Sequence, residues 1–335
     1  MTGTELSPTV SVALCTHNGA SYLREQLLSI LNQSRQPDEV VLSDDASTDD
    51  TLEVADRAFA EWRSGRPDST VTLRVIRNRV PLGVAANFEQ ALAACSGELC
   101  ALSDQDDVWY PRRLEVMAAE FAGRPELQLL HSDARLVDGR GMPLGSTLLQ
   151  TLGVTADEKR DVHEGRAFDV LLRRNIITGA TAVVRRELVE RSRPFPSAWV
   201  HDEWLAIVAA ATGTVDFLDE ALIDYRQHGG NQIGVTSLNA AGRLGRLQAA
   251  RTRRNERLLA RAEALDERAP GLIPSPSETY LRDIRAKVAH ERARSAFPRA
   301  RFRRVLPVLR QWRTGGYTRF GRGPQDVLRD LVQPV

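Results

Sequence analysis

The chain has 335 residues, 42% of them hydrophobic, which is enough for one large α/β domain with an appendage or for two modest domains. Its 45 basic residues nearly balance its 44 acidic ones, so the overall charge gives no reason to expect a nucleic-acid partner. The three cysteines lie in apolar stretches without CxxC spacing, which argues against a cysteine zinc site and is typical of a reducing compartment.

Residues 9–133 alternate short β-branched runs with longer segments of helical period, which is the pattern of βα units. The predicted strands are Val10–Cys15, Glu39–Ser43, Val71–Arg77, Leu99–Ser103 and Leu127–His131. The predicted helices, several with Ser, Asp or Asn placed to cap them, lie near Tyr22–Asn32, Thr51–Trp62, Ala85–Ala94 and Pro111–Phe121. The sequence therefore predicts an α/β fold with a Rossmann-like, mostly parallel sheet flanked by helices.

The later part of the chain is less regular. A strand at Thr181–Val184 and a helix from about Asp202 to Ala211 are expected to complete the sheet and the second wall of a cleft. Beyond them, Leu238–Arg268 and Ser277–Ser295 are rich in Ala, Leu, Arg and Glu at helical spacing. We therefore expect a main domain over 1–235 and a helical, basic C-terminal region over 236–335.

Polar residues gather directly after three predicted strands. These clusters are Thr16-His17-Asn18, Asp44-Asp45 and Asp104-Gln105-Asp106-Asp107. Ligands of open α/β sheets bind beside the carboxyl ends of the strands, so we expect the three clusters to converge on one crevice.

The third cluster carries the strongest chemical signal. In extended chain Asp104 and Asp106 share a face, and two such carboxylates repel each other unless a cation lies between them. Hard oxygen ligands favour Mg²⁺ or Mn²⁺, and a diphosphate is the natural third component. The alternative is that Asp106 or Asp107 caps a helix beginning near Trp109. We favour a metal, because one cap does not explain three acids after a buried strand.

The other two clusters are less specific. Ser47, Thr48 or Asp49 could cap a helix, which leaves Asp44 and Asp45 to accept hydrogen bonds from a base or a ribose. The segment after the first strand lacks GxGxxG spacing, and no GxxxxGK[ST] occurs in the chain. The sequence thus disfavours dinucleotide-binding and P-loop functions.

Two downstream segments also carry polar side chains. Asp202 and Glu203 begin a predicted helix, where they either compensate the helix dipole or supply a general base; spacing alone favours the first. In the segment Tyr225–Asn231, taken as a loop, His228 is a candidate third metal ligand and Arg226 a candidate partner for phosphate.

Taken in order, these motifs resemble bacterial family 2 glycosyltransferases of GT-A fold, and within them the rhamnosyltransferase-like branch of surface-polysaccharide assembly. The resemblance covers about residues 10–231. Its marks are Thr16-His17-Asn18-Gly19, the helix Gln26–Gln33, Ser43–Ser47, Asn78 with Gly83 and Asn87, Ser103–Trp109, His201–Trp204 and Tyr225–Asn231.

The resemblance implies a role for each cluster in binding a nucleotide sugar. It implies that Thr16, Asn18 and Asp45 line a pyrimidine nucleoside pocket and that Asp104 holds the ribose. His17 stands where the family more often has Tyr. On this basis residues 9–133 bind the nucleotide sugar, residues 134–235 face the acceptor, and the expected donor is dTDP-rhamnose.

The resemblance also implies a mechanism. Asp106 would bind the metal, with His228 as a further ligand, and this metal would stabilise the charge that grows on the leaving diphosphate. Asp202 would take the proton from an acceptor hydroxyl in one displacement that inverts the configuration of the sugar. The expected acceptor is a saccharide or a lipid-linked molecule.

The C-terminal region carries a separate signal. Residues 297–323 contain eight arginines and no acid, interleaved with aromatic residues, which indicates contact with an anionic membrane surface. The alternatives are a solvated basic helix pair packed on the main domain and an RNA-like patch, and Pro307 and Gly315-Gly316 interrupt any long amphipathic face. No run approaches the ~18 apolar residues of a spanning helix, so we expect a cytoplasmic protein at the inner face of the plasma membrane.

Two rival functions remain at this point. A sugar nucleotidyltransferase would also use paired acids on an α/β sheet, but a Gly-rich basic phosphate loop is expected near its N-terminus, and Thr16–Ala20 supplies none. The second rival is a nucleotide-sugar-binding scaffold that has the fold without turnover.

Overall fold

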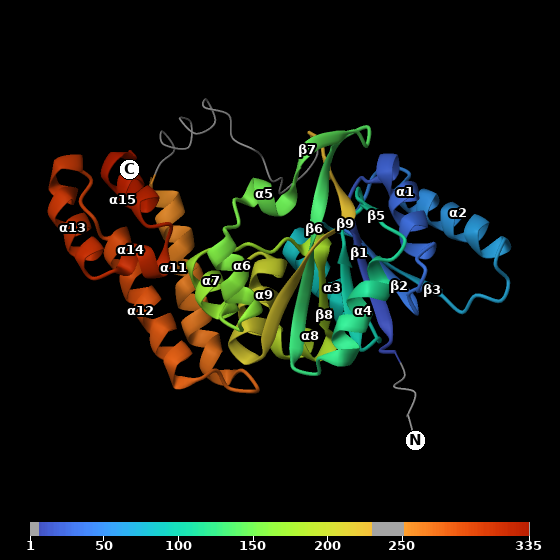
Figure 1. The fold of residues 1–335 in the computed structure, drawn as a ribbon. Coiled ribbons are helices and arrows are strands. Elements are labelled where there is room, and N and C mark those ends of the chain that lie inside the picture. The colour runs from blue at the N-terminus through green and yellow to red at the C-terminus, as the bar shows by residue number, and fades with distance from the viewer. Residues whose placement is uncertain (1–6, 230–250, 335) are drawn as a thin grey trace, which may run out of the picture.

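One twisted sheet crosses the centre of the main domain, and helices cover both of its faces (Figure 1). The computed structural model describes residues 7–229 and 251–334. The strands are β1 (Val10–Thr16), β2 (Glu39–Asp44), β3 (Thr72–Arg77), β4 (Leu99–Ser103), β5 (Val108–Trp109), β6 (Leu127–Asp138), β7 (Pro143–Thr147), β8 (Ala182–Arg185) and β9 (Thr214–Gln227).

The strand order places the polar clusters side by side. Across the sheet it runs β3-β2-β1-β4-β8-β6-β9-β5, and β7 also pairs with β6. The first four strands pair in parallel, as do β6 and β9, whereas β8 runs antiparallel to β4 and β6. The carboxyl ends of β2, β1 and β4 therefore lie next to one another, as the sequence predicts.

The helices form the outer layers. In the main domain they are α1 (Ala20–Leu31), α2 (Thr51–Ser64), α3 (Val84–Ala94), α4 (Arg113–Gly123), α5 (Leu148–Leu152), α6 (Ala156–His163), α7 (Ala167–Arg173), α8 (Arg186–Ser192) and α9 (His201–Thr212), with a 3-10 turn η1 (Gly179–Thr181). The predicted strand–helix alternation is confirmed, and element ends differ by a few residues.

Alternate residues of the central strands enter two different cores. In β1, Val12 and Leu14 pack with α1, α2 and α4, whereas Ala13 packs with α3, α8 and α9 on the other face. Because both faces of these strands are buried, their sequences are nearly continuous apolar runs.

The predicted helix caps at α1 to α4 are confirmed only in part. None of the residues at the four N-cap positions, Asp50 of α2 included, makes a side-chain cap hydrogen bond. Asp49, one of the predicted caps, does accept a hydrogen bond from the backbone N–H of Thr51, the first residue of α2, at 3.1 Å. Capping boxes instead begin α5 and α6, where Thr147 and Thr155 each accept a hydrogen bond from a backbone N–H three residues later. Other polar residues after β1, β2 and β4 form hydrogen bonds within and between these loops.

The C-terminal region is helical, as predicted. It contains α11 (Arg251–Arg268), η2 (Ala269–Gly271), α12 (Glu278–Ser295), η3 (Arg301–Arg304), α13 (Val305–Arg313), α14 (Gly316–Phe320) and α15 (Pro324–Val332). Part of the predicted helix at 238–268, the 235/236 boundary and Asn231 lie outside the described residues. Within the described residues, no helix has both the length and the apolar composition needed to cross a bilayer.

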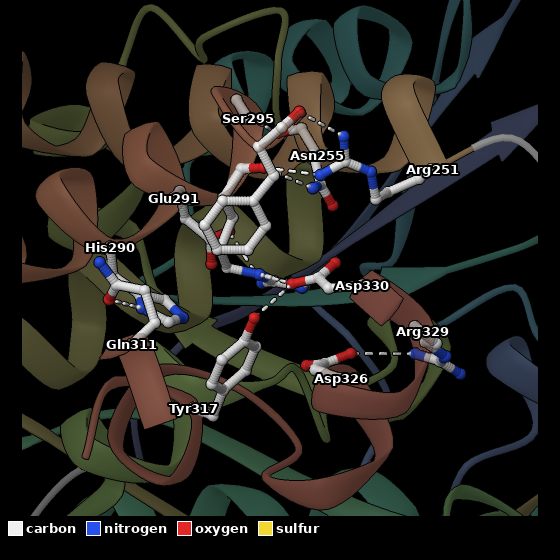
Figure 2. Close-up of polar contacts among 12 residues, drawn as sticks. Arg251, Asn255, His290, Glu291, Ser295, Gln311, Tyr317, Asp326, Arg329 and Asp330 are labelled. Carbon is white, nitrogen blue, oxygen red and sulfur yellow. Dashed lines mark hydrogen bonds and ion pairs between the residues drawn. The ribbon is translucent and has the colours of Figure 1, made fainter. Parts of the chain in front are cut away.

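The C-terminal region shares a core with the main domain and also has a polar core of its own. Leu265, Ile284 and Phe320 join the apolar core on the α9 side of the sheet. In the polar core, the buried Asp330 accepts hydrogen bonds from Arg294 Nε at 2.7 Å and from the Tyr317 hydroxyl at 2.8 Å (Figure 2). The helices α11, α12, α14 and α15 thus pack as an extension of the main domain.

Candidate active site

The acids after β4 lie in the short loop that leads to β5. Asp107 is buried, and its Oδ1 accepts a hydrogen bond from the backbone N–H of Arg226 at 3.0 Å. The alternative of a helix cap at Asp106 or Asp107 is wrong, because α4 begins only at Arg113 and the backbone N–H of Leu114 in its first turn donates to Oε1 of Gln33 at 3.0 Å. The loop is tied instead to the end of β9.

Asp104 lies where acids from different elements meet. Its pKa is raised to about 7, first by burial and then by the negative charges of Asp106 and Asp202. Asp104 and Asp45, after burial, both raise the pKa of the Cys15 thiol. The carboxylates that follow β2 and β4 and the one that begins α9 therefore share one electrostatic environment, which a cation would stabilise.

Asp106 faces His228 directly. The imidazole Nε2 of His228 lies 2.7 Å from Oδ2 of Asp106, and the ring of His228 stacks on Tyr22 with 4.6 Å between centroids. Both Asp106 and His228 retain only partial solvent access. The sequence placed His228 in a loop, whereas the structure carries β9 as far as Gln227 and so sets His228 immediately beyond the strand.

Arg226 is buried rather than open to a ligand. Its Nε donates to the backbone carbonyl of Asp106 at 2.7 Å, and its Nη2 donates to Glu25 at 2.7 Å. Its guanidinium also lies over the ring of Tyr22, 5.0 Å from the centroid. This geometry makes Arg226 a positioning residue for the Asp106 loop and corrects its assignment to the diphosphate.

The loop after β1 is joined to the acidic loop by Gln105. The side chain of Gln105 accepts a hydrogen bond from the backbone N–H of His17 at 2.8 Å and donates one to its carbonyl at 3.1 Å. A Cβ atom at Gly19 would lie 2.2 Å from Oε1 of Gln105, so only glycine permits this approach.

The loops after β1 and β2 are joined in the same way. Asn18, at a φ of 50°, accepts a hydrogen bond from the backbone N–H of Thr48 at 2.9 Å, and the backbone N–H of Asn18 donates to Ser47. The imidazole Nδ1 of His17 lies 2.7 Å from the carbonyl oxygen of Asp45. Asn18 itself stays exposed at the surface of this junction.

Asp44 and Asp45 have different surroundings. Asp44 is fully buried and accepts hydrogen bonds from Thr16 Oγ1 and from the backbone and hydroxyl of Ser47. Asp44 and Thr16 therefore shape the loop, and the structure does not present Asp44 to a nucleotide. Oδ1 of Asp45 accepts from the backbone N–H of Leu82 at 2.6 Å and from Nδ2 of Asn78 at 3.3 Å, whereas Oδ2 accepts from the backbone N–H of Gly83 at 2.9 Å and has further capacity to accept from a ligand.

Asp202 lies in the first turn of α9 and faces the turn η1. Its Oδ2 accepts from the backbone N–H of Gly179 at 2.8 Å, and its Oδ1 accepts from that of Glu203 at 2.7 Å. Burial raises the pKa of Asp202, while these hydrogen bonds and the charge of Arg261 oppose the increase. The neighbouring His201 stacks on Phe88, and burial lowers its pKa to about 3, so its ring is a neutral packing element.

Sequence reasoning missed several residues of the site. Gln105, Tyr22, Glu25 and Gly179 act through partners 23 to 206 residues away in the chain, and a local pattern does not reveal such pairings. The glycine at position 179 was the one such signal in the sequence. The structure explains it, because a Cβ atom there would lie 2.9 Å from Nε2 of His201.

The chemistry of the donors fits a divalent cation. Asp106 and His228 present one carboxylate oxygen and one imidazole nitrogen at the same point, and Asp104 adds a carboxylate in the same environment. Carboxylate oxygens suit Mg²⁺ or Mn²⁺. Among residues 7–229 and 251–334, however, no three His, Cys, Asp or Glu side chains are already arranged around one point as a metal site.

Comparisons with known proteins agree with this geometry. Residues 11–193, more than half of the chain, match the family described as Glycosyl transferase family 2. An uncharacterized protein of Mycobacterium bovis is 29% identical over 230 residues, which are 65% of this chain and 59% of that protein. The chain thus spans less than two thirds of the length of this relative.

Two solved structures share the fold. TarS 1–349 of S. aureus, in complex with UDP-GlcNAc, has a TM-score of 0.56 and 20% identity, over 84% of this chain and 72% of that chain. The mannosyltransferase PcManGT of Pyrobaculum calidifontis, in complex with GDP-Man and Mn²⁺, has a TM-score of 0.54 and 19% identity, over 98% of this chain and 86% of that chain. The sheet topology and the match over residues 11–193 together show that the chain belongs to glycosyl transferase family 2 and has the GT-A fold.

Proposed function

We propose that the protein is a metal-dependent, inverting glycosyltransferase that moves a sugar from a nucleoside-diphosphate donor to a hydroxyl of a saccharide or lipid-linked acceptor. The observation that carries the proposal is that Asp202, in the first turn of α9, and Asp106, after β4, both lie close enough to Asp104 for their charges to raise its pKa. A base on one element and a diphosphate-binding loop on another are what a single displacement needs on opposite sides of the sugar.

Asp202 is the general base of the proposed reaction. In its ionised form its carboxylate removes the proton of the acceptor hydroxyl as that oxygen attacks the anomeric carbon, and the bond to the diphosphate breaks in the same step. Its raised pKa makes the carboxylate a stronger base than an exposed Asp. The hydrogen bonds from Gly179 and Glu203 hold the carboxylate in one orientation.

Asp106 and His228, with Asp104 beside them, are the proposed holders of Mg²⁺ or Mn²⁺. When bound, this cation neutralises charge on the leaving diphosphate. Arg226 fixes the backbone of Asp106 so that the carboxylate faces His228. The Mn²⁺ named with the mannosyltransferase of P. calidifontis supports this part of the proposal.

The nucleoside lies, in this proposal, over the joined loops after β1 and β2. Asn18 and Asp45 would contact the base and Asp104 the ribose, while Thr16 and Asp44 hold the loops in shape. TarS and the mannosyltransferase are named with UDP-GlcNAc and GDP-Man, which supports a nucleotide-sugar donor without fixing its identity. Resemblance to the rhamnosyltransferase-like branch makes dTDP-rhamnose our first choice, in surface-polysaccharide synthesis.

An exposed face of η3 and α13 supports membrane contact through residues 297–323. Phe302 and Leu306 are 77% and 78% exposed, and Val305, Leu309 and Trp312 repeat along the same helical face. Five exposed arginines flank these side chains, and within the described residues none of the five makes an ion pair: Arg299, Arg301, Arg303, Arg310 and Arg313. Apolar side chains ringed by arginines fit an anionic leaflet.

Substitution of the proposed base tests the reaction directly. Asp202→Asn should retain nucleotide binding, while turnover falls by about 10²–10⁴, the usual contribution of a general base. The assay is donor hydrolysis or transfer with a panel of nucleotide sugars and Mn²⁺, and Glu220→Gln, an exposed acid on β9, is the control. Unchanged turnover in Asp202→Asn would remove Asp202 from the mechanism, and the absence of turnover in the wild-type protein with every donor would favour a binding scaffold.

A further inference from the structure

A cavity lies between the main domain and the C-terminal region. Its volume is about 250 Å³, and it is lined by residues of α7, α11 and α12 and of the segment around α14 and α15. The proposed donor site, by contrast, lies at the carboxyl ends of β1, β2 and β4. None of the strand-end motifs lines this cavity.

The lining of the cavity is strongly cationic. Nine of its 20 lining residues are Arg or Lys, and only Glu291 and Asp326 are acidic. Three further acids pair with lining arginines from outside the cavity: Glu158, Glu203 and Asp330. Among the residues that the structure describes, nine cations therefore face five carboxylates, which gives the cavity an excess of positive charge.

Two of the lining arginines form no ion pair that would stabilise the fold. Among the described residues, neither Arg173 nor Arg257 makes an ion pair, and the buried Nε of Arg173 has no hydrogen-bond partner. A buried N–H group without a partner costs free energy unless a ligand or water accepts its hydrogen bond.

Like charges are also held close together here. The pKa of Arg254 is lowered, first by burial and then by Arg294, and that of Arg261 is lowered by burial and by Arg257. An anion in the cavity would relieve both the burial and the repulsion.

The cavity lies close to the proposed catalytic base, because Arg261 in its lining acts on the charge of Asp202. Arg261 forms an ion pair with Glu203, the residue after Asp202, and its guanidinium lies 4.1 Å from the ring centroid of Trp199. Both Arg261 and Trp199 line the cavity. A group bound here would be attached to the substrate whose hydroxyl approaches Asp202.

We propose that this cavity binds the phosphate or pyrophosphate group of the acceptor, and hence that the acceptor is a phosphorylated molecule. The planar fork of a guanidinium group matches phosphate oxygens in two-bond contacts, and several arginines around one cavity suit a multiply charged anion. The apolar walls formed by Leu171, Leu258 and Phe320 suit a substituent that continues from the phosphate. The inference rests on the proposed function, since it names the acceptor of that reaction.

The test measures binding and does not depend on turnover. Inorganic pyrophosphate is titrated by calorimetry into the full chain, with its donor site saturated by a nucleoside diphosphate and Mn²⁺. We expect one pyrophosphate per chain, and we expect Arg257→Ala and Arg173→Gln each to weaken it by about tenfold. Arg253→Ala, which removes an exposed arginine of α11 outside the cavity, should bind as the wild type does. Donor-nucleotide affinity should be the same in all four proteins, which separates failure of the cavity from failure of the donor site.

Arg257 is exposed, so its variant is expected to fold normally, and a thermal melt checks this.

A prenyl diphosphate titrated in parallel distinguishes the sources of the phosphate: tighter binding than pyrophosphate identifies a lipid diphosphate, and equal binding identifies a soluble phosphorylated acceptor. Equal pyrophosphate affinity in the wild type and in both cavity variants, or tighter binding of succinate than of pyrophosphate, would overturn the proposal.

Discussion

The imidazole Nε2 of His228 lies 2.7 Å from the carboxylate Oδ2 of Asp106, although 122 residues separate them in the chain. The contact exists because β9 ends at Gln227, beside the loop that follows β4. Arg226 reinforces it by donating to the carbonyl of Asp106. The last strand of the sheet thus completes a site that the first four strands begin.

The pH dependence of turnover follows from the burial of Asp202. Burial raises its pKa above the ordinary value of 3.8, and a general base acts only when ionised. As the pH falls through this raised pKa, kcat/KM should fall, so the acidic limb of the profile should lie above pH 3.8. Circular dichroism at each pH checks that the fold persists. A profile that stays flat down to the ordinary carboxyl range would argue against Asp202 as the base.

Gly19→Ala should disturb the loop Asp104–Asp107 without changing any of its carboxylates. Its Cβ would displace the side chain of Gln105 and break the two hydrogen bonds to His17. We expect a loss of about 1–3 kcal/mol in the free energy of unfolding and a weaker affinity for nucleotide with Mn²⁺. Gly123→Ala is the control, because nothing lies within 4 Å of its added Cβ. Equal stability and affinity in the two variants would show that the contact with Gln105 is unimportant.

Asp330→Asn should destabilise the C-terminal region. Asp330 is fully buried, accepts a hydrogen bond from the Tyr317 hydroxyl (Figure 2) and pairs with Arg294 and Arg254. The change removes one counter-charge from each arginine, which leaves Arg294 with Glu291 and Arg254 with Asp326. Removing one partner of a buried pair costs about 3–5 kcal/mol. Chemical denaturation measures the change, and Glu263→Gln, in an exposed pair with Arg292, should cost less than about 1 kcal/mol. Similar losses in the two variants would contradict the assigned importance of Asp330.

Leu306→Glu should reduce binding to anionic vesicles. The change places a negative charge in the exposed apolar face of α13, among arginines that attract an anionic leaflet. Sedimentation with phosphatidylcholine vesicles, with and without phosphatidylglycerol, measures the effect. Leu144→Glu, at an exposed leucine of β7, is the control. Wild-type protein that does not sediment with phosphatidylglycerol, or a change in oligomeric state in Leu306→Glu, would point to a protein partner for this face.

Much of the fold could be predicted because its signals are local. The apolar runs of β1, β2 and β4 and the helical period of α1 and α9 are each readable within about a dozen residues. β9 was not predicted, because Asp216, Asp219, Glu220 and Asp224 interrupt its apolar pattern. Its mixed neighbours in the sheet, parallel β6 and antiparallel β5, explain why polar positions are tolerated there.

The sequence predicted which loops carry the candidate site, but it did not predict the contacts between those loops. Acids at strand ends identify a crevice because parallel strands end at one edge of a sheet. The same pattern does not tell a carboxylate that faces the crevice, such as Asp106, from one that is enclosed by its own loop, such as Asp44. Arg226 shows the same limit, because its burial against Glu25 depends on a residue 201 positions away.

The most direct test of the central claim is calorimetric titration of a nucleoside diphosphate into the wild type and Asp106→Ala, with Mn²⁺ and with a chelator. The account predicts that Mn²⁺ strengthens binding to the wild type, and that Asp106→Ala binds weakly and equally under both conditions, because the ligand that joins metal and diphosphate is gone. Wild-type affinity that is the same with Mn²⁺ and with chelator would contradict it.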